Sequence, residues 1–394
     1  MKKSITVALS AMTGLFKPQQ KFITSLLLTL CLFRGKATFR NLSRYSDYCE
    51  KTYSRQYRKS FDFTQFNLNI LTKELPKKAH LIAAMDCHFT EKSGQKSYGL
   101  AWFHNGKTGR SERGLEFSEL AIIDVNYNTA YHLSSKQTPS QLEDDQTRMD
   151  VYLQHLSRDK HHLPKSISHL VLDGYYAKNK FINGVLDEGL HAISKLRHDA
   201  HLRWLYTGEQ KPLGRRKQYD GKVIFDEHQE RFEQQVLDSD TLLYTAIVNS
   251  PSLKLNIRVV FLVHKGKRKA ILFSTDTELE ATEIVRYYHS RFQIEFLFRD
   301  ARQYTGLGDC QSPNKKALTF HFNASMTALN LLKLQDREGA EKRDDHVISI
   351  QRLKIRKFNQ YLIDRIISLL DFQPTSIKLH PEYQGLINYG AIAA

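Results

Sequence analysis

The segment VRYYHSRFQIEFLFRDARQ, residues 285–303, carries the pattern that decides how the chain is interpreted. On an α-helix, which turns by about 100° per residue, Tyr288, Arg291, Glu295 and Arg302 fall within an arc of about 60°. One carboxylate would then lie among cationic and phenolic groups, which suits a residue that holds a divalent metal beside phosphates. The alternative is an amphipathic surface helix with intrahelical ion pairs.

The composition of the chain indicates a polyanionic partner. Its 394 residues suffice for two or three domains with a buried core. They include 58 Lys and Arg against 42 Asp and Glu, which gives a formal charge of +16 and a pI of about 9.5. Nucleic acid is the first expectation. A basic membrane-surface protein is the alternative, but no lipidation signal or long basic amphipathic helix supports it.

Two aspartates follow apolar segments of β-strand character. HLIAAM, residues 80–85, runs into Asp86, and SHLVL, residues 168–172, runs into Asp173. Further strands are expected at 97–103 and 115–125, and a helix is expected at 141–156.

Three strands, a helix and a fourth strand form the order of a ribonuclease H-like domain. The first and fourth strands of that fold are neighbours, so Asp86 and Asp173 would meet at the strand ends. The alternative for each is an ordinary aspartate in a turn.

These motifs resemble those of insertion-sequence transposases with a DDE catalytic domain. The spacing of Tyr288, Arg291, Glu295 and Arg302 is similar to the Tyr-Arg-Glu-Lys signature of the family, and it departs from the signature at Arg302. Three further blocks resemble those around the first and second Asp of the family: MDCHFTEKSGQKSYGLAWF (85–103), GLE (114–116) and VLDGYYAKNKFI (171–182).

The resemblance implies a metal-dependent DNA transposase. Asp86, Asp173 and Glu295 would be the catalytic residues and would hold two Mg²⁺ or Mn²⁺ ions. Tyr288, Arg291 and Arg302 would contact the phosphates of the element ends.

The implied reaction is cut-and-paste transposition, in which cleavage at the ends of the element is followed by strand transfer to target DNA. The implied partners are the terminal repeats and the target DNA, with a homodimer in the DNA complex and no membrane. The four cysteines are widely spaced and form no CxxC pair, which indicates a reducing cytosol. The resemblance further implies a bacterial cytoplasm and association with the nucleoid.

The patterns divide the chain into five segments of an α/β protein. Residues 1–76 would form a helical DNA-binding domain, and residues 77–203 and 276–335 a ribonuclease H-like mixed-sheet catalytic domain in two parts. A β-rich insertion at 204–275 would separate the two parts. Residues 336–394 would form a C-terminal helical region, which begins with the charged linker GAEKRDD at 339–345.

Two basic segments are candidates for further DNA contacts. TYSRQYRKSF, residues 52–61, interleaves Arg55, Arg58 and Lys59 with tyrosines. TGEQKPLGRRKQYDGK, residues 207–222, is expected to form a loop beside the active site that holds phosphates by charge. The basic residues of this loop that we expect to bind DNA are Arg215, Arg216 and Lys217. The alternative for both segments is a solvated surface loop.

Two other functions stay open on the sequence alone. One is another metal-dependent nuclease with the ribonuclease H-like fold, against which only the Tyr-Arg-Glu-basic helix argues. The other is a catalytically silent DNA-binding protein derived from a transposase. The presence of Asp86, Asp173 and Glu295 argues against that second function.

Overall fold

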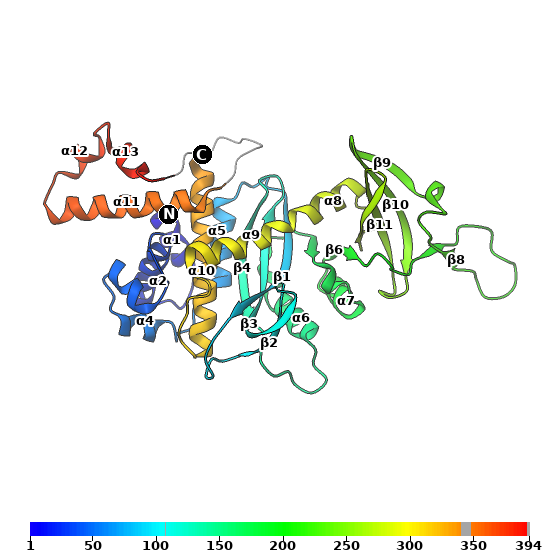
Figure 1. Cartoon of the computed structure of the whole chain (residues 1–394), viewed down its shortest axis with the longest axis horizontal. Helices are drawn as coiled ribbons and strands as arrows, with labels where there is room; N and C mark the ends of the chain where they lie inside the picture. The colour runs from blue at the N-terminus through cyan, green and yellow to red at the C-terminus, as the bar shows by residue number, and fades with distance from the viewer. Residues whose placement is uncertain (107, 340–347, 392–394) are drawn as a thin grey trace.

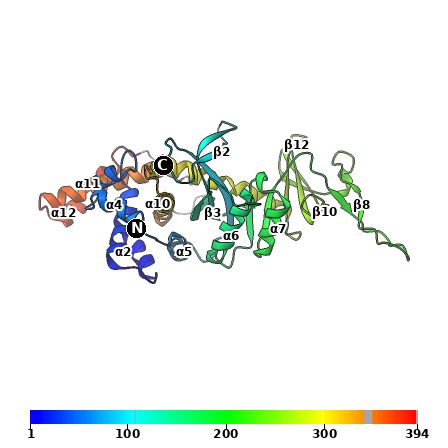
Figure 2. The ribbon, with the colours of Figure 1, turned by 90° about the horizontal axis from the view of Figure 1, so that it is seen from below.

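The computed structural model describes residues 1–106, 108–339 and 348–391 as one elongated molecule (Figure 1). Helices from both ends of the chain gather at one end, the mixed sheet lies in the middle, and the insertion strands lie at the far end. Figure 2 shows the same three regions side by side from below. The charged linker predicted at 339–345 lies almost entirely outside the described residues.

The helices of the amino-terminal region form part of the main apolar core. Ile5, Leu26 and Tyr53 are fully buried in the same cluster as strand residues. The cluster also includes a long helix from the second half of the chain, α10 (Lys315–Gly339), against which α2 and α5 pack. The helices of this region are α1 (Lys2–Ser10), α2 (Lys17–Leu30), α3 (Phe39–Leu42), α4 (Glu50–Gln56) and α5 (Phe63–Glu74).

One mixed sheet runs through the molecule, in the order β2-β3-β1-β5-β6-β12-β11-β10-β7-β8. The pairs β1–β5 and β5–β6 are parallel, and the other pairs are antiparallel. The part of the sheet that lies outside the predicted insertion consists of β1 (Leu81–Glu91), β2 (Ala101–Asn105), β3 (Arg110–Asp124), β4 (Thr129–Gln137), β5 (His169–Leu172) and β6 (His191–Leu196). The order β4-β3-β1-β5-β6 confirms the predicted ribonuclease H-like mixed sheet.

The third strand of that fold is β4, which the sequence did not reveal. It pairs antiparallel with β3, while β2, expected as a main strand, forms a hairpin extension on the other part of β3. Nearly every residue of β4 is buried on both faces. Six of its nine residues, TAYHLSSKQ, have polar side chains, so the strand lacks the apolar run by which a strand buried on both faces is recognised.

The crossover helix α6 (Arg148–Asp159) begins later than expected. Thr147 caps the helix in a capping box with Asp150, which fixes the first turn at Arg148. The acidic residues at 143–145 precede the helix, and Asp145 has a positive φ of 62°. A second crossover helix, α7 (Asn179–Asp187), connects β5 to β6 and has Phe181, Ile182 and Val185 buried.

Helix α10 covers the open edge of β4 with side-chain amides. The backbone N–H of His132 donates to Asn330 Oδ1 at 2.8 Å, and Asn330 Nδ2 donates to the His132 carbonyl at 2.7 Å. Asn323 makes the same pair of bonds with the backbone of Ser135, at 3.0 and 3.1 Å. These amides satisfy backbone groups that a neighbouring strand would otherwise satisfy.

The strands of the predicted insertion continue the same sheet. β12 (Lys267–Ser274) pairs antiparallel with β6, so the sheet passes without a gap from one region to the other. The remaining strands are β7 (Arg203–Leu205), β8 (Tyr219–Lys222), β9 (Glu233–Asp238), β10 (Thr241–Ser250) and β11 (Leu255–His264). The expected boundary between 203 and 204 falls within β7, and the domain division stays a prediction.

The remaining helices follow the insertion. They are α8 (Ala281–Ser290), α9 (Phe292–Asp300), α10, α11 (Ile350–Leu369), α12 (Pro374–Lys378) and α13 (Tyr383–Asn388). Across the described part of the chain, we find no helix with both the length and the apolar character needed to cross a bilayer.

We predict that Asn330→Leu lowers the free energy of unfolding by about 2 to 4 kcal/mol. The change leaves the N–H and carbonyl of His132 buried without their partner. Denaturant unfolding of the purified protein measures the loss.

Ser325→Ala on the same helix is the matched control for this prediction. The buried Ser325 hydroxyl has no hydrogen-bond partner among the described residues. Its removal should change the unfolding free energy by less than about 1 kcal/mol. Equal losses in the two variants would contradict the role assigned to the Asn330 amide.

Candidate active site

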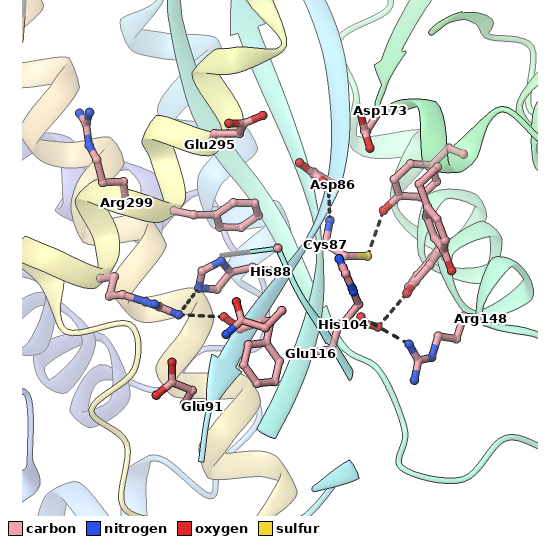
Figure 3. Close-up of a pocket in the computed structure, with 18 of the residues that line it drawn as sticks. Asp86, Cys87, His88, Glu91, His104, Glu116, Arg148, Asp173, Glu295 and Arg299 are labelled. Atoms are coloured by element: carbon pink, nitrogen blue, oxygen red, sulfur yellow. Dashed lines mark hydrogen bonds and ion pairs between the residues drawn. The ribbon is translucent and has the colours of Figure 1, made fainter. Parts of the chain in front are cut away.

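A cavity of about 1050 Å³ opens where β1, β3, α9 and the short 3₁₀ helix η3 (Gly174–Tyr176) meet. Asp86, Asp173 and Glu295 all line it. Figure 3 shows these three carboxylates along one side of the cavity, on three different elements. The structure therefore brings together the three acidic residues that the sequence singled out.

The strand register explains why Asp86 and Asp173 lie close together. The parallel pairing of β1 with β5 ends at the pair Met85 and Leu172, so each aspartate is the next residue along its chain. Asp173 follows the end of β5 as expected. Asp86 does not end its strand, because β1 continues to Glu91 through its antiparallel pairing with β3.

Arg291 joins Asp86 to Glu295. Its Nη2 donates to Glu295 Oε1 at 2.8 Å, and its Nη1 lies 3.6 Å from Asp86 Oδ2. The Arg291 side chain is 7% exposed, whereas that of Glu295 is 46% exposed. The guanidinium is thus a buried cation between two of the three carboxylates.

The environment of Asp86 disfavours its charged form. Burial raises the pKa of Asp86 to about 7, and the nearby charges of Asp173 and Glu295 act in the same direction. Arg291 and the backbone N–H of Cys87, which donates to Asp86 Oδ1 at 2.8 Å, oppose this rise in pKa. A further cation in the cavity would stabilise the ionised carboxylate.

The Tyr-Arg-Glu-basic segment is not one uninterrupted helix. Tyr288 lies on α8, Glu295 lies on α9, and Arg291 is the residue at which the two helices meet. Arg302 lies beyond α9 in a short π-helical segment, η5 (Ala301–Thr305). The predicted single helical face is therefore wrong in detail, since a π turn winds more slowly than an α-helix.

Arg302 and Tyr288 nevertheless lie near the same carboxylates. Arg302 lines the cavity, and its Nη2 donates to the Phe89 carbonyl at 2.8 Å and lies 3.2 Å from His88 Nε2. The Arg291 guanidinium lies 5.7 Å from the centre of the Tyr288 ring. Burial raises the pKa of Tyr288, so its hydroxyl stays a neutral hydrogen-bonding group.

The cavity has a second polar cluster that the sequence analysis did not identify. Tyr152 donates its hydroxyl hydrogen to Glu116 Oε1 at 2.7 Å, and Arg148 Nη1 lies 4.0 Å from Glu116 Oε2. Figure 3 shows Glu116 and Arg148 at the opposite side of the cavity from Glu295. Arg148 and Tyr152 are four residues apart on α6, a helical spacing that could have indicated a shared face.

The basic loop of the insertion does not lie beside the cavity. Arg215, Arg216 and Lys217 belong to the connection between β7 and β8, which projects at the far end of the molecule (Figure 1). The three side chains are exposed. The expectation of a loop next to the carboxylates is therefore wrong, because β7 and β8 form an outer edge of the extended sheet.

The basic segment of the amino-terminal region divides into two faces. Tyr53 and Tyr57 are fully buried, whereas Arg55, Arg58 and Lys59 are exposed. Tyr57 packs on helix α10 through Phe320, whose ring centre lies 4.6 Å from its own, and Tyr53 packs on Phe22 of α2 at 5.4 Å. The aromatic residues of this segment are thus core residues, and DNA contact by its three cations stays a prediction.

The donor chemistry of the cavity fits a divalent ion of the magnesium type. Three carboxylates from β1, the end of β5 and α9 supply hard oxygen ligands. Among the described residues, however, no group of three or more His, Cys, Asp or Glu is close enough together to hold an ion. The guanidinium of Arg291 takes part of the space between Asp86 and Glu295.

Comparisons with known proteins bear on the fold and the family. The transposase DDE domain family matches residues 121–331, more than half of the chain. No curated protein matches the sequence.

Two solved structures are similar to the chain to a limited degree. The first is a piggyBac transposase synaptic complex with hairpin DNA, at 11% identity and a TM-score of 0.40, covering 100% of this chain and 81% of that one. The second is the NurA nuclease from Sulfolobus solfataricus, at 13% identity and a TM-score of 0.26, covering 69% and 90%. Both scores are too low to support an argument about function.

The family match includes Asp173 and Glu295, the end of β3 and the strands β4, β5 and β6, whereas Asp86 on β1 lies before the matched range. Transposases with this domain act on DNA as nucleases and generally use divalent metal ions. The chain belongs to the transposase DDE domain family and is a DNA transposase.

Proposed function

We propose that this transposase cleaves DNA at the ends of its own element and joins the released ends to target DNA. The observation that carries this proposal is the position of Asp86, Asp173 and Glu295 on one cavity. Their elements are far apart in the sequence, and the parallel register of β1 and β5 aligns the two aspartates. The three residues would be the catalytic carboxylates.

The same residues would hold the metal ions that the reaction needs. Asp86, Asp173 and Glu295 would bind two Mg²⁺ or Mn²⁺ ions. When bound, such ions supply an activated oxygen nucleophile and stabilise the departing oxygen.

Arg291 would change partners when DNA and metal ions bind. Its Nε is buried and has no acceptor among the described residues, so the guanidinium can accommodate an additional oxygen. A DNA phosphate offers such an oxygen and would draw the guanidinium from Asp86 and Glu295. The two carboxylates would then be free to bind cations.

Tyr288 and Arg302 would position the end of the element on either side of the carboxylates. The Tyr288 hydroxyl, with its raised pKa, would donate a hydrogen bond to a phosphate. Arg302 would contact DNA while still anchored to the end of β1 through the Phe89 carbonyl. We further propose that the exposed cations Arg55, Arg58, Lys59, Arg215, Arg216 and Lys217 bind DNA away from the cavity, and that a homodimer forms on the DNA.

Incubation with the DNA that flanks the gene tests the reaction itself. With Mn²⁺ present, we expect cuts at defined positions in inverted repeats, followed by joining of the 3′ ends to a supercoiled plasmid. Sequencing of the products locates both events. Cuts without any joined product would indicate a nuclease, and binding without cuts would indicate a silent DNA-binding protein.

We predict that Asp86→Ala and Glu295→Ala each reduce cleavage by roughly a thousandfold or more, which corresponds to about 4 kcal/mol of barrier. Each change removes one carboxylate from the cavity. DNA binding, measured in the same preparations, should persist because the carboxylates repel phosphates.

Glu283→Gln is the matched control for the loss of cleavage. Glu283 is an acidic residue of α8 that pairs with Arg286 outside the cavity. The Glu283→Gln variant should cleave DNA at the wild-type rate. Cleavage that survives the loss of both Asp86 and Glu295 would overturn the catalytic assignment.

We predict that Asp86→Asn stabilises the metal-free protein at high pH. The pKa of Asp86 in the folded state is about 7, above its usual value of 3.8. The folded state therefore binds this proton more tightly, and the ionised carboxyl destabilises the fold increasingly as pH rises from about 4 to about 7.

Thermal unfolding with a chelator present measures this effect. The melting temperature of Asp86→Asn should exceed that of the wild type above pH 7, and the difference should vanish below about pH 4. A difference that is the same at every pH would show that the pKa of Asp86 is the same in the folded and unfolded states, and it would contradict the prediction.

A further inference from the structure

A basic hollow lies next to Asp173, on the side of β6 and β12. Its volume is about 360 Å³, and Gly174 forms the part of its wall closest to the carboxylates. The other wall residues come from the end of β6 and the start of β12. The basic residues of the wall are Lys195, Arg197, His198, Arg268 and Lys269.

The charge of this hollow is not balanced within the structure. None of the described residues that line it is acidic. Arg197 pairs with a neighbouring acid, Asp199, at 3.0 Å. Lys195 and Lys269 are exposed, and no ion pair of theirs is found among the described residues. Several cations in a small concave space favour an anionic ligand.

The hollow is held at a fixed position relative to Asp173. Ser194 donates its hydroxyl hydrogen to the Asp173 carbonyl at 3.0 Å. A Cβ atom on Gly174 would lie 3.2 Å from the Lys195 carbonyl oxygen, so the glycine allows the end of β5 to approach β6 closely. Four pairs of residues between β6 and β12 then fix Lys195 relative to the start of β12.

We propose that this hollow binds the backbone phosphates of duplex DNA next to the phosphate that is cleaved, with Lys195 and Lys269 as the main contacts. The inference rests on the proposed cleavage at the carboxylate cavity. If the cleaved phosphate lies at Asp173, the neighbouring phosphates of the same duplex would lie beside Gly174 and the hollow. Each DNA strand has one charge per roughly 3.4 Å of helix axis.

Duplex DNA fits this surface better than a small anion does. The cations are exposed and lie on two neighbouring strands, so they form an open track instead of an enclosed pocket. The track begins at the catalytic carboxylates and runs toward the insertion strands that follow β12 in the sheet. Lysines at such a site act as point charges on the backbone and contribute affinity without sequence preference.

The salt dependence of DNA binding tests the proposal. The full-length protein, without divalent metal, is titrated into a labelled duplex taken from the DNA flanking its gene and into a duplex of unrelated sequence. The plot of log association constant against log salt concentration should be shallower in Lys195→Gln/Lys269→Gln by about 2, because two phosphate contacts are lost. The effect should be the same for both duplexes.

Two further variants keep this test decisive. Lys195→Arg/Lys269→Arg keeps the charges and should retain the wild-type slope. Lys73→Gln/Lys165→Gln removes two exposed lysines outside the hollow, one on α5 and one in the loop before β5. This variant should also retain the wild-type slope. The proposal is overturned if the Lys195→Gln/Lys269→Gln variant has the wild-type slope. It is also overturned if the slope becomes equally shallow in the Lys73→Gln/Lys165→Gln variant.

The outcome is separable from that of the cleavage experiment. A shallower slope in a protein that never cuts DNA would support the basic hollow and reject the proposed reaction. Normal DNA cleavage by the wild type, together with an unchanged slope in Lys195→Gln/Lys269→Gln, would reject only the proposed DNA contact at the basic hollow. Circular dichroism of each variant verifies that the surface substitutions leave the fold intact.

Discussion

The guanidinium of Arg291 holds two acidic side chains, Asp86 and Glu295, in one partly buried cavity. Three carboxylates in such a space repel one another and lose hydration, which is visible in the raised pKa of Asp86. A cation among them is therefore a condition for the site to exist in the folded protein. In the free protein Arg291 is part of that positive charge, and metal ions would supply more of it in the working enzyme.

The rest of the fold serves to bring these acids to one place. The parallel strands β1 and β5 place two of them side by side by register alone. The position of the third acid, Glu295, depends on helix α9, which packs on the sheet through the buried residues Ile294 and Leu297. Helix α10 in turn supports α9 and closes the edge of β4 with the amides of Asn323 and Asn330. A loss of packing between α9 and α10 would therefore displace Glu295 more readily than either aspartate.

Much of the site could be predicted because its elements carry local signals. Apolar strands that run into Asp86 and Asp173, and a helical spacing around Glu295, are visible in short stretches of sequence. The fold class followed from the order of strands and helices, but β4 escaped notice because most of its buried residues are polar and form no apolar run.

Features that depend on distant contacts could not be predicted. The π turn that holds Arg302, the Glu116 cluster and the burial of Tyr53 and Tyr57 are all set by tertiary packing. The shared sheet of the insertion has a similar origin, since β12 is the hydrogen-bonded neighbour of β6. Removal of the insertion would leave the backbone amides of β6 unpaired at a new edge of the sheet, and an exposed edge of this kind favours aggregation. Natural variation in length should accordingly concentrate in the connection between β7 and β8, which can grow or shrink without disturbing the sheet or the carboxylate cavity.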